Sequence, residues 1–415
     1  MNFMIFARSA PRSCFIRSFV CQNTARSYPF PEKMRTPSQR SFSVDGAESE
    51  EDAHEIMFYS LRKPATVTLK EMYAFGASSK HSTRTLLLAA QFLHEELPVR
   101  LARRARELSK LPFGLGDTIS IKGVRKLYER SFFRIRRFPK PTTPQLEQRF
   151  SEMLDDIKTE HNSVQANIAR GLQELSEVRK DVQRGHGVFV HDGMPFDFGE
   201  FLDRFYMSRV GLRVLIGQHI MLHHPQKGFV GIIQTECQPA VVCSHAMEDA
   251  RRICDNNYGI APEVKLEGSI DMTLPYIPEH LHYMLFELLK NSMRAVVERY
   301  RDSKEGLPPI SVVFAEGTED VAIKISDKGG GIPRSGMHRL WTYTFTTAGS
   351  TADKLHDLAR GEGKGIMAGF AHGLPLSRIY ARSFGGDLHV MSMQGHGTDV
   401  YIHISKLGDR EVAVP

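Results

Sequence analysis

The feature that most constrains the fold of this chain is a change in the spacing of its apolar residues near residue 225. Before that point, apolar residues recur every three or four positions, which is typical of amphipathic helices. Pro112, Gly114 and Pro141 interrupt the pattern. Short breaks place consecutive helices side by side, so we expect four long helices in an all-α four-helix bundle. The clearest repeating stretches are 83–112, 146–179 and 201–223.

After residue 225, short alternating segments that are typical of strands are interspersed with helical ones. Strands are predicted over 229–236, 262–268, 271–277, 309–316, 320–327, 387–393 and 398–405, with 262–268 and 271–277 forming a pair. Helices are predicted over 240–257, 283–300 and 374–384, and a glycine-broken stretch covers 329–368. Strands and helices do not strictly alternate, so we expect an α+β sandwich, in which helices cover one face of a mixed sheet.

These patterns divide the chain into four segments. The first, residues 1–45, is a targeting or disordered segment, and the second, residues 46–224, is the helical bundle. The third, residues 225–408, contains the sheet, and residues 409–415 are a tail. A chain of 415 residues is long enough for two domains that each have a hydrophobic core.

The net charge of +6 belongs to the N-terminus. Residues 1–43 hold seven Lys and Arg residues against one acid, and the remainder is balanced at 47 of each sign. The charge therefore gives no argument for nucleic-acid binding. This segment is rich in Arg and Ser, poor in acids and interspersed with Phe and Ile, which is typical of a mitochondrial transit peptide. The alternative is a disordered basic tail.

Integral membrane proteins are disfavoured, and so are small proteins held together by zinc sites or disulfides. No apolar run approaches the ~20 residues of a membrane span. Cys14 and Cys21 fall in the basic N-terminus, and Cys237, Cys243 and Cys254 have neither paired zinc-site spacing nor an even-numbered disulfide framework. We expect buried thiols in a reducing compartment.

A polar stripe runs along the predicted helix over 283–300. Glu287, Lys290, Asn291 and Arg294 stand at i, i+3, i+4 and i+7, on one face, while the flanking positions are apolar. One interpretation is a solvated face, stabilised by only ~0.2–0.5 kcal/mol per pair. The other is that the stripe faces a pocket and handles a charged ligand.

Three further motifs follow this helix. Asp327 ends a strand and is followed by Gly329 and Gly331, so its carboxylate can accept from an exocyclic amine while the backbone passes close to a flat ring. The stretch 369–375, GFAHGLP, opens a helix, and free amides at a helix N-terminus can bind phosphates. Thr398 enters the last strand, where its hydroxyl either serves a purine or only begins the strand. Each motif alone is weak.

Together and in this order, the motifs resemble the ATP-binding fold (Bergerat or GHKL type) of type II topoisomerases, the heat-shock ninety chaperones, histidine kinases and mismatch-repair ATPases. The resemblance implies ATP and Mg²⁺ as ligands, with Asn291 binding Mg²⁺, Glu287 as general base and Asp327 on the adenine amino group. It also implies that Lys290 and Arg294 complete the positive surroundings of the nucleotide. The phosphates would be held by the backbone amides of Gly369, Phe370, Ala371, His372, Gly373 and Leu374.

Longer stretches narrow the resemblance to the mitochondrial 2-oxo acid dehydrogenase kinases, which are protein serine kinases. It is carried by FELLKNSMRAVVE, KISDKGGGIP, GLPLSRIYARSFGGDL and GTDVYI, and by LHEELPVRLARRARELSKLPF and SRVGLRVLIGQHIMLH in the helical half. FVGIIQTE, ARRICDNNYGIAPEV, FTTAGST, GTDVY and Tyr283 are similar to the branched-chain kinases, whereas MLFEL and SRIYAR are more similar to the pyruvate dehydrogenase kinases. We favour the branched-chain kinases and keep the pyruvate dehydrogenase kinases as the alternative.

This resemblance implies further contacts with ATP and a K⁺ ion. The sequence departs from the family pattern at one position, Ala371. Thr346 and Thr347 match residues that contact ATP, and a K⁺ ion beside the nucleotide would be held at Leu340, Thr342, Phe345 and Ala371. Ala371 replaces the middle glycine of the family pattern Gly-Phe-Gly-x-Gly-Leu-Pro, which puts the affinity for nucleotide in question.

The implied reaction is phosphorylation of the decarboxylase component of the dehydrogenase complex in the mitochondrial matrix by a homodimer. The implied anchor is the lipoyl-bearing acyltransferase core. Residues 97–140, with thirteen Lys and Arg against three acids, either dock the lipoyl-bearing domain or are solvated helix faces. A sensor histidine kinase is disfavoured because His219 lacks the acceptor pattern, and we interpret His219 as structural or substrate-facing. A non-catalytic, ATP-switched binding module would not need Glu287.

Overall fold

The computed structural model describes residues 49–78, 83–178, 189–191, 194–304, 306–343 and 372–406. Residues 54–415 form one compact unit and residues 1–53 another. In the N-terminal unit, only residues 49–53 are described. Helix α2 (Glu50–Ser60) begins there. The predicted transit peptide over 1–45 and tail over 409–415 lie outside the described residues.

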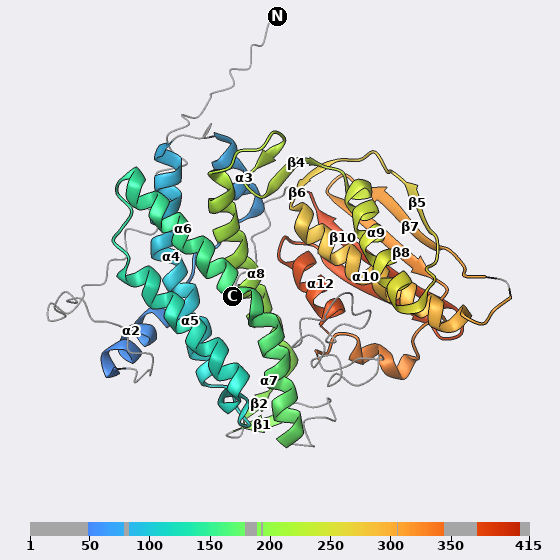
Figure 1. Ribbon diagram of the computed structural model, residues 1–415, viewed down its shortest axis with the longest axis horizontal. Coiled ribbons are helices and arrows are strands. Elements are labelled where there is room, and N and C mark those ends of the chain that lie inside the picture. Colours follow the sequence, from blue (N-terminus) through green and yellow to red (C-terminus); the bar gives the residue numbers. More distant parts are fainter. Residues whose placement is uncertain are drawn as a thin grey trace, which may run out of the picture. The chain divides into compact units, whose positions relative to one another are not determined.

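The first half of the larger unit is helical, as predicted (Figure 1). Its main helices pack as a bundle in which α4 contacts α5, α6 and α8, and α5 contacts α7. Helix α4 continues through Pro98, whereas Pro144 begins α6 behind the N-cap Thr143. The elements are α3 (Leu69–Ser78), α4 (Thr83–Ser109), η1 (Leu115–Asp117), α5 (Ile119–Arg137), α6 (Pro144–Glu160), η2 (His161–Ser163), α7 (Val164–Val178), β1 (Phe189–His191), β2 (Met194–Phe196) and α8 (Phe198–Leu222).

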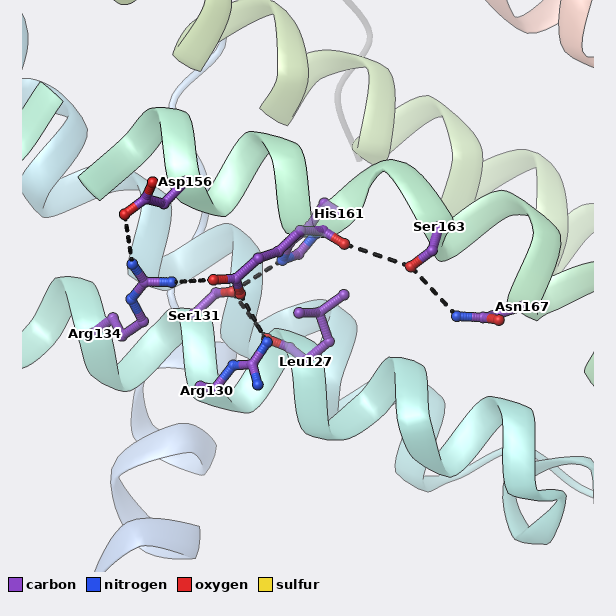
Figure 2. Close-up of polar contacts among 9 residues, drawn as sticks. Leu127, Arg130, Ser131, Arg134, Asp156, His161, Ser163 and Asn167 are labelled. Atoms are coloured by element: carbon purple, nitrogen blue, oxygen red, sulfur yellow. Dashed lines mark hydrogen bonds and ion pairs between the residues drawn. The ribbon is translucent and has the colours of Figure 1, made fainter. Parts of the chain in front are cut away.

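The predicted helix over 146–179 is two helices, α6 and α7, separated by the single turn η2. Figure 2 shows this junction against α5. Ser131 on α5 lies 2.9 Å from His161 Nε2, while Arg130 and Arg134 each donate to Glu160 at 2.7 Å. The carbonyl of His161 accepts from Arg209 on α8 at 2.8 Å. Side chains from α5 and α8 thus bind the backbone and the polar groups of the junction, which periodicity along 146–179 could not reveal.

The buried ring of His161 makes stability depend on pH. The side chain is 1% exposed, and burial, aided by Arg209, lowers its pKa to about 3. Between pH 6.5 and 3 the unfolded chain therefore binds a proton that the folded chain does not, so stability is lost as the pH falls. At pH 5 this costs about 2 kcal/mol. In His161→Gln, residue 161 does not titrate. Its unfolding free energy should therefore fall by about 2 kcal/mol less than that of the wild type between pH 7 and pH 5, as urea denaturation would measure. An unchanged slope would contradict this assignment.

The second half holds a five-stranded mixed sheet in the order β5-β7-β8-β10-β9. Strands β5 and β7 are parallel, and the other neighbours are antiparallel. Helices α10 and α12 contact this sheet, and α9 packs beside α10 (Figure 1). The bounds are α9 (Pro239–Tyr258), β5 (Val264–Gly268), α10 (Pro278–Tyr300), β7 (Ile310–Glu316), β8 (Asp320–Asp327), η4 (Arg334–Arg339), α12 (Gly373–Arg382), β9 (Asp387–Met393) and β10 (Gly397–Ser405).

The predicted pairing of 262–268 with 271–277 is wrong. β5 pairs with β7, and β6 (Leu274–Tyr276) pairs with β4 (Ile233–Cys237) in a separate sheet that also contains β3 (Phe229–Val230). The chain leaves β5 at Gly268, with φ at +87°, and Ser269 N still donates to the carbonyl of Phe314 on β7 at 2.9 Å. Alternation shows which residues face a core, but the partner strand is set by contacts distant in sequence.

The prediction of buried thiols is confirmed for the three cysteines that the structure describes, while the reducing compartment stays a prediction. Cys237, Cys243 and Cys254 are free and buried, and burial raises their pKa values to about 11, 12 and 11. They are therefore protonated thiols at neutral pH. Within the described ranges, none of the longer helices has a continuous apolar stretch of the length that a bilayer crossing requires.

Candidate active site

The polar stripe of α10 is divided between buried and exposed positions. Lys290 is only 4% exposed; its ammonium donates to Glu287 Oε1 at 2.7 Å and lies 5.2 Å from the centre of the Phe286 ring. Asn291 is exposed, so its amide oxygen can reach a ligand. Arg294 donates to Glu298 at 2.7 Å one turn further along. The structure therefore contradicts a uniformly solvated face, because the Glu287–Lys290 pair is largely removed from water.

Asp327 lies at the end of β8, and donors from α10, from the following loop and from the Thr398 backbone hold its carboxylate. Ser292 Oγ on α10 donates to Oδ2 at 3.0 Å, and the amide of Gly329 donates to Oδ1 at 2.8 Å. Burial raises the pKa of this carboxyl, opposed by these hydrogen bonds. A carboxylate offers about four acceptor positions, so acceptor capacity remains for a ligand amine. Sequence reasoning missed Ser292, whose only signal was a small polar residue on an otherwise apolar side of α10.

The glycines after Asp327 allow close approach to two elements. A Cβ on Gly329 would lie 2.4 Å from the Cβ of Ala295 on α10. Gly331 has φ at +68°, and a Cβ there would lie 2.1 Å from the carbonyl oxygen of Met393. Arg299, which sequence reasoning also missed, donates to the carbonyls of Lys328, Gly395 and His396 at 2.9–3.0 Å. The loop is thus fixed between the polar stripe of α10 and the β9–β10 turn.

Glu287 also abuts the first residue of α12. A Cβ on Gly373 would lie 2.1 Å from Glu287 Oε2, so the carboxylate fills the space beside this helix N-terminus. His372 precedes it, 2% exposed, and burial lowers the pKa of its ring to about 4. Its Nδ1 lies 3.4 Å from the hydroxyl of Tyr206 on α8. The Tyr343 hydroxyl donates to Asp203 on the same helix at 2.6 Å. Side chains of α8 therefore help to position the start of α12.

Gly373→Ala should separate activity from stability. The added methyl meets the end of a flexible side chain and the backbone needs no left-handed φ, so the fold should tolerate it. The Glu287 carboxylate must move away from the α12 N-terminus, and we expect the phosphoryl transfer that the family resemblance implies to slow by about tenfold or more, because small misplacements of a reacting group are costly. Steady-state kinetics and thermal melting would check this. Gly123→Ala, where a Cβ would meet nothing within 4 Å, is the matched control.

The remaining predicted residues are only partly described. Thr398 stands opposite Asp327 in the β10–β8 register, and its hydroxyl lies 2.9 Å from that of Ser392. Leu340 follows η4, and Thr342 Oγ1 donates to the carbonyl of Arg339 at 2.8 Å. Leu374 lies in the first turn of α12. Phe345, Thr346, Thr347, Gly369, Phe370 and Ala371 lie outside the described residues.

Two other predicted features lie apart from this constellation. His219 is 2% exposed and contacts Ser151 and Glu147 on α6, which is consistent with a structural role. Eight of the thirteen basic residues of 97–140 form ion pairs. Arg100 is buried against Glu96, and further ion pairs are Arg104–Glu107, Lys122–Asp117, Arg125–Glu129, Arg130–Glu160, Arg134–Glu160, Arg136–Glu55 and Lys140–Glu95.

The described site combines a carboxylate beside a helix N-terminus, an exposed amide oxygen and a second carboxylate held by a glycine loop. An amide oxygen is a ligand that hard divalent cations such as Mg²⁺ accept. The helix N-terminus favours anions. The residues present therefore fit a nucleotide with its magnesium ion, in an arrangement that can place a general base near a phosphoryl group.

Comparison with known proteins gives the family. Residues 66–234 match the family model described as mitochondrial branched-chain alpha-ketoacid dehydrogenase kinase, and residues 276–407 match that of histidine kinase-, DNA gyrase B- and HSP90-like ATPases. A mitochondrial pyruvate dehydrogenase (acetyl-transferring) kinase of Arabidopsis thaliana is 46% identical over 88% of this chain and 96% of its own length. The corresponding Drosophila melanogaster kinase is 37% identical, covering 85% and 84%, and human isozyme 3 is 36% identical, covering 84% of each.

These relatives do not support the predicted order of the two subfamilies, because all three are named as kinases of pyruvate dehydrogenase. They do agree with the resemblance on which the prediction rested, and with its ATP-binding fold. The chain is a protein kinase of the mitochondrial 2-oxo acid dehydrogenase kinase family.

Proposed function

We propose that this chain transfers the γ-phosphoryl group of Mg-ATP to a serine on the decarboxylase component of the pyruvate dehydrogenase complex and thereby inactivates it. The substrate is supported by the relatives, which are named as pyruvate dehydrogenase kinases. The Arabidopsis kinase among them is 46% identical to this chain, over 96% of its own length. The observation that carries the chemistry is the position of Glu287, between the Lys290 ammonium and the first residue of α12.

Glu287 accepts the proton of the serine hydroxyl as the serine oxygen bonds to the γ-phosphorus and the bond to the ADP oxygen breaks. Lys290 holds the carboxylate in place at 2.7 Å, so the general base is oriented before substrate arrives. Asp327 accepts from the adenine amino group, with Gly329 and Gly331 allowing the ring to lie close to the backbone. Asn291 would hold Mg²⁺, which supplies neutralisation of phosphate charge when bound.

The other ligand contacts rest on the family resemblance. Backbone amides from Gly369 to Leu374 hold the phosphates, and Thr346 and Thr347 contact ATP. A K⁺ ion is held at Leu340, Thr342, Phe345 and Ala371. The enzyme works as a homodimer in the mitochondrial matrix, anchored on the lipoyl-bearing acyltransferase core. Most Lys and Arg side chains of 97–140 form ion pairs. We therefore do not propose a charged patch in this range as the anchoring surface.

A second candidate substrate is the decarboxylase component of the branched-chain 2-oxo acid dehydrogenase complex. The description of the family model over residues 66–234 favours it, as does Tyr283 four residues before Glu287. The two candidates share the site and the reaction and differ only in the protein that is phosphorylated.

The test is transfer from γ-labelled ATP to the two purified decarboxylase components, each with and without its lipoyl-bearing core. Faster labelling of a serine on the pyruvate component, increased by its core, is the expected result. Faster labelling of the branched-chain component would replace the first candidate by the second. ATP binding without transfer to either would overturn the kinase proposal and favour an ATP-switched binding module.

A further inference from the structure

A buried cluster in the helical half lies outside the active site. Helices α6 and α8 lie side by side (Figure 1), and each supplies a pair of polar side chains one turn apart. Glu147 and Ser151 come from α6, and His219 and His223 come from the C-terminal end of α8. Glu147 is 4% exposed, Ser151 8% and His219 2%, so three polar side chains meet where the described helices otherwise pack apolar residues.

The polar atoms of the four side chains converge on one point. Glu147 Oε1 lies 3.2 Å from His219 Nε2 and 2.9 Å from His223 Nε2. Ser151 Oγ lies 2.7 Å from His219 Nε2, 3.0 Å from His223 Nε2 and 3.0 Å from Glu147 Oε1. One ligand atom from each of Glu147, His219 and His223 lies within 4.8 Å of the others.

The cluster holds a buried carboxyl group and a buried ring nitrogen that has no partner among the described residues. Burial by itself would raise the pKa of Glu147, but hydrogen bonds from the two imidazoles outweigh it and lower the pKa to about 2, so a carboxylate anion is buried here. Burial lowers the pKa of His219, opposed by the hydrogen bond and the charge of Glu147. With its proton on Nε2, His219 has a bare Nδ1 that is buried and has no partner among the described residues.

We propose that Glu147, His219 and His223 bind one divalent transition-metal ion of the zinc class, with Ser151 or a water as the fourth ligand, and that this ion fastens α6 to α8. Two imidazoles and one carboxylate are a donor set that zinc accepts. Histidines four residues apart on one helix present their nitrogens on the same face. Magnesium prefers oxygen ligands and would not compete at this site.

The spacing of the atoms suits such an ion. Tetrahedral zinc with bonds of about 2.0–2.1 Å separates its ligand atoms by about 3.3 Å. The separations that involve Glu147 or Ser151, 2.7–3.2 Å, need to open by no more than about 0.6 Å to reach that value, and the two imidazole nitrogens lie within 4.8 Å of each other. Binding would remove the protons from the two Nε2 atoms, as metal ions generally do.

Access and affinity also follow from the surroundings. The side chain of His223 is 21% exposed, which gives an ion a route from solvent. Metal binding would move the His219 proton to Nδ1, where the described residues supply no acceptor. Outer-shell acceptors typically change metal affinity by about 10–100-fold, so we expect this site to bind more weakly than zinc sites that have them.

The experiment uses the full chain without an affinity tag, stripped by a chelator and kept free of nucleotide. Equilibrium dialysis against Zn²⁺ with excess Mg²⁺ gives the stoichiometry, and Co²⁺ gives a visible spectrum that reports tetrahedral nitrogen and oxygen ligation. The variants are His223→Gln and Glu147→Gln, and the matched control is His224→Gln, which changes the exposed neighbouring histidine. Circular dichroism confirms that each variant is folded.

The expected result is about one more Zn²⁺ per chain in the wild type and in His224→Gln than in either cluster variant. A tetrahedral Co²⁺ spectrum and a metal-dependent rise in melting temperature should be lost together in both cluster variants. His223→Gln changes a partly exposed residue, so it should stay folded if Glu147→Gln does not. Equal zinc uptake by the wild type and folded His223→Gln, or an octahedral spectrum unaffected by the variant, would overturn the proposal.

Discussion

Glu287→Gln should lower the rate of phosphoryl transfer by about 10²–10⁴-fold, the usual contribution of a general base. The substitution keeps an acceptor for the Lys290 ammonium at the position of Oε1, so the geometry of the stripe is retained while the proton acceptor is lost. Binding of ATP should change little, because Asp327 and Asn291 are untouched. Single-turnover transfer and nucleotide titration on the same protein would measure the two effects separately.

Two companion variants make this result specific. Glu287→Gln leaves the charge of Lys290 buried without an anionic partner, which should destabilise the fold. Adding Lys290→Met should restore much of the stability without restoring transfer, because no base returns. Glu279→Gln, an exposed carboxyl in the first turn of the same helix, should keep wild-type activity. Full activity in Glu287→Gln would remove Glu287 from the chemistry.

Gly331→Ala should destabilise the protein by about 2–5 kcal/mol, since a left-handed φ costs about 1–2 kcal/mol and overpacking adds about 1–3 kcal/mol. The new Cβ would lie 2.1 Å from the carbonyl oxygen of Met393 and 2.9 Å from that of Gly397, both of which are backbone atoms. The loop would have to leave the β9–β10 turn and move Asp327 with it. We therefore also expect weaker ATP binding, measured by calorimetry alongside urea denaturation.

Gly395→Ala is the matched control for this prediction. Its φ is +84°, close to that of Gly331, but a Cβ there would meet nothing within 4 Å. It should therefore lose only the cost of the left-handed backbone. If both variants lose the same stability, the close approach to Met393 does not constrain the loop.

Periodicity and motif order predicted the parts of the structure that depend on local sequence. The stripe on α10 and the carboxylate at the end of β8 lie where they were expected, because side-chain spacing fixes a helix face and a turn follows its glycines. The break at η2 was missed because the residues of 161–163 do not interrupt the helical pattern and the break depends on contacts with α5 and α8.

Contacts between distant segments explain the other differences. Lys290 belongs to the polar stripe in sequence, yet it is buried, since α10 packs against β8 and against α9 and α12. Ser292 and Arg299 each bind a group more than 25 residues away, as the hydrogen bonds to Asp327 and Lys328 show. No spacing along a single helix can indicate such partners.

The parallel pairing of β5 with β7 has a consequence for how the active site opens. The chain leaves β5, forms β6 and α10, and only then returns as β7, so α10 lies within the crossover between two paired strands. α10 could move away from the sheet without separating β5 from β7 only if both of the segments that connect it to these strands rearranged. Its central amides should therefore exchange with deuterium as slowly as those of β7, in one cooperative unit with the sheet.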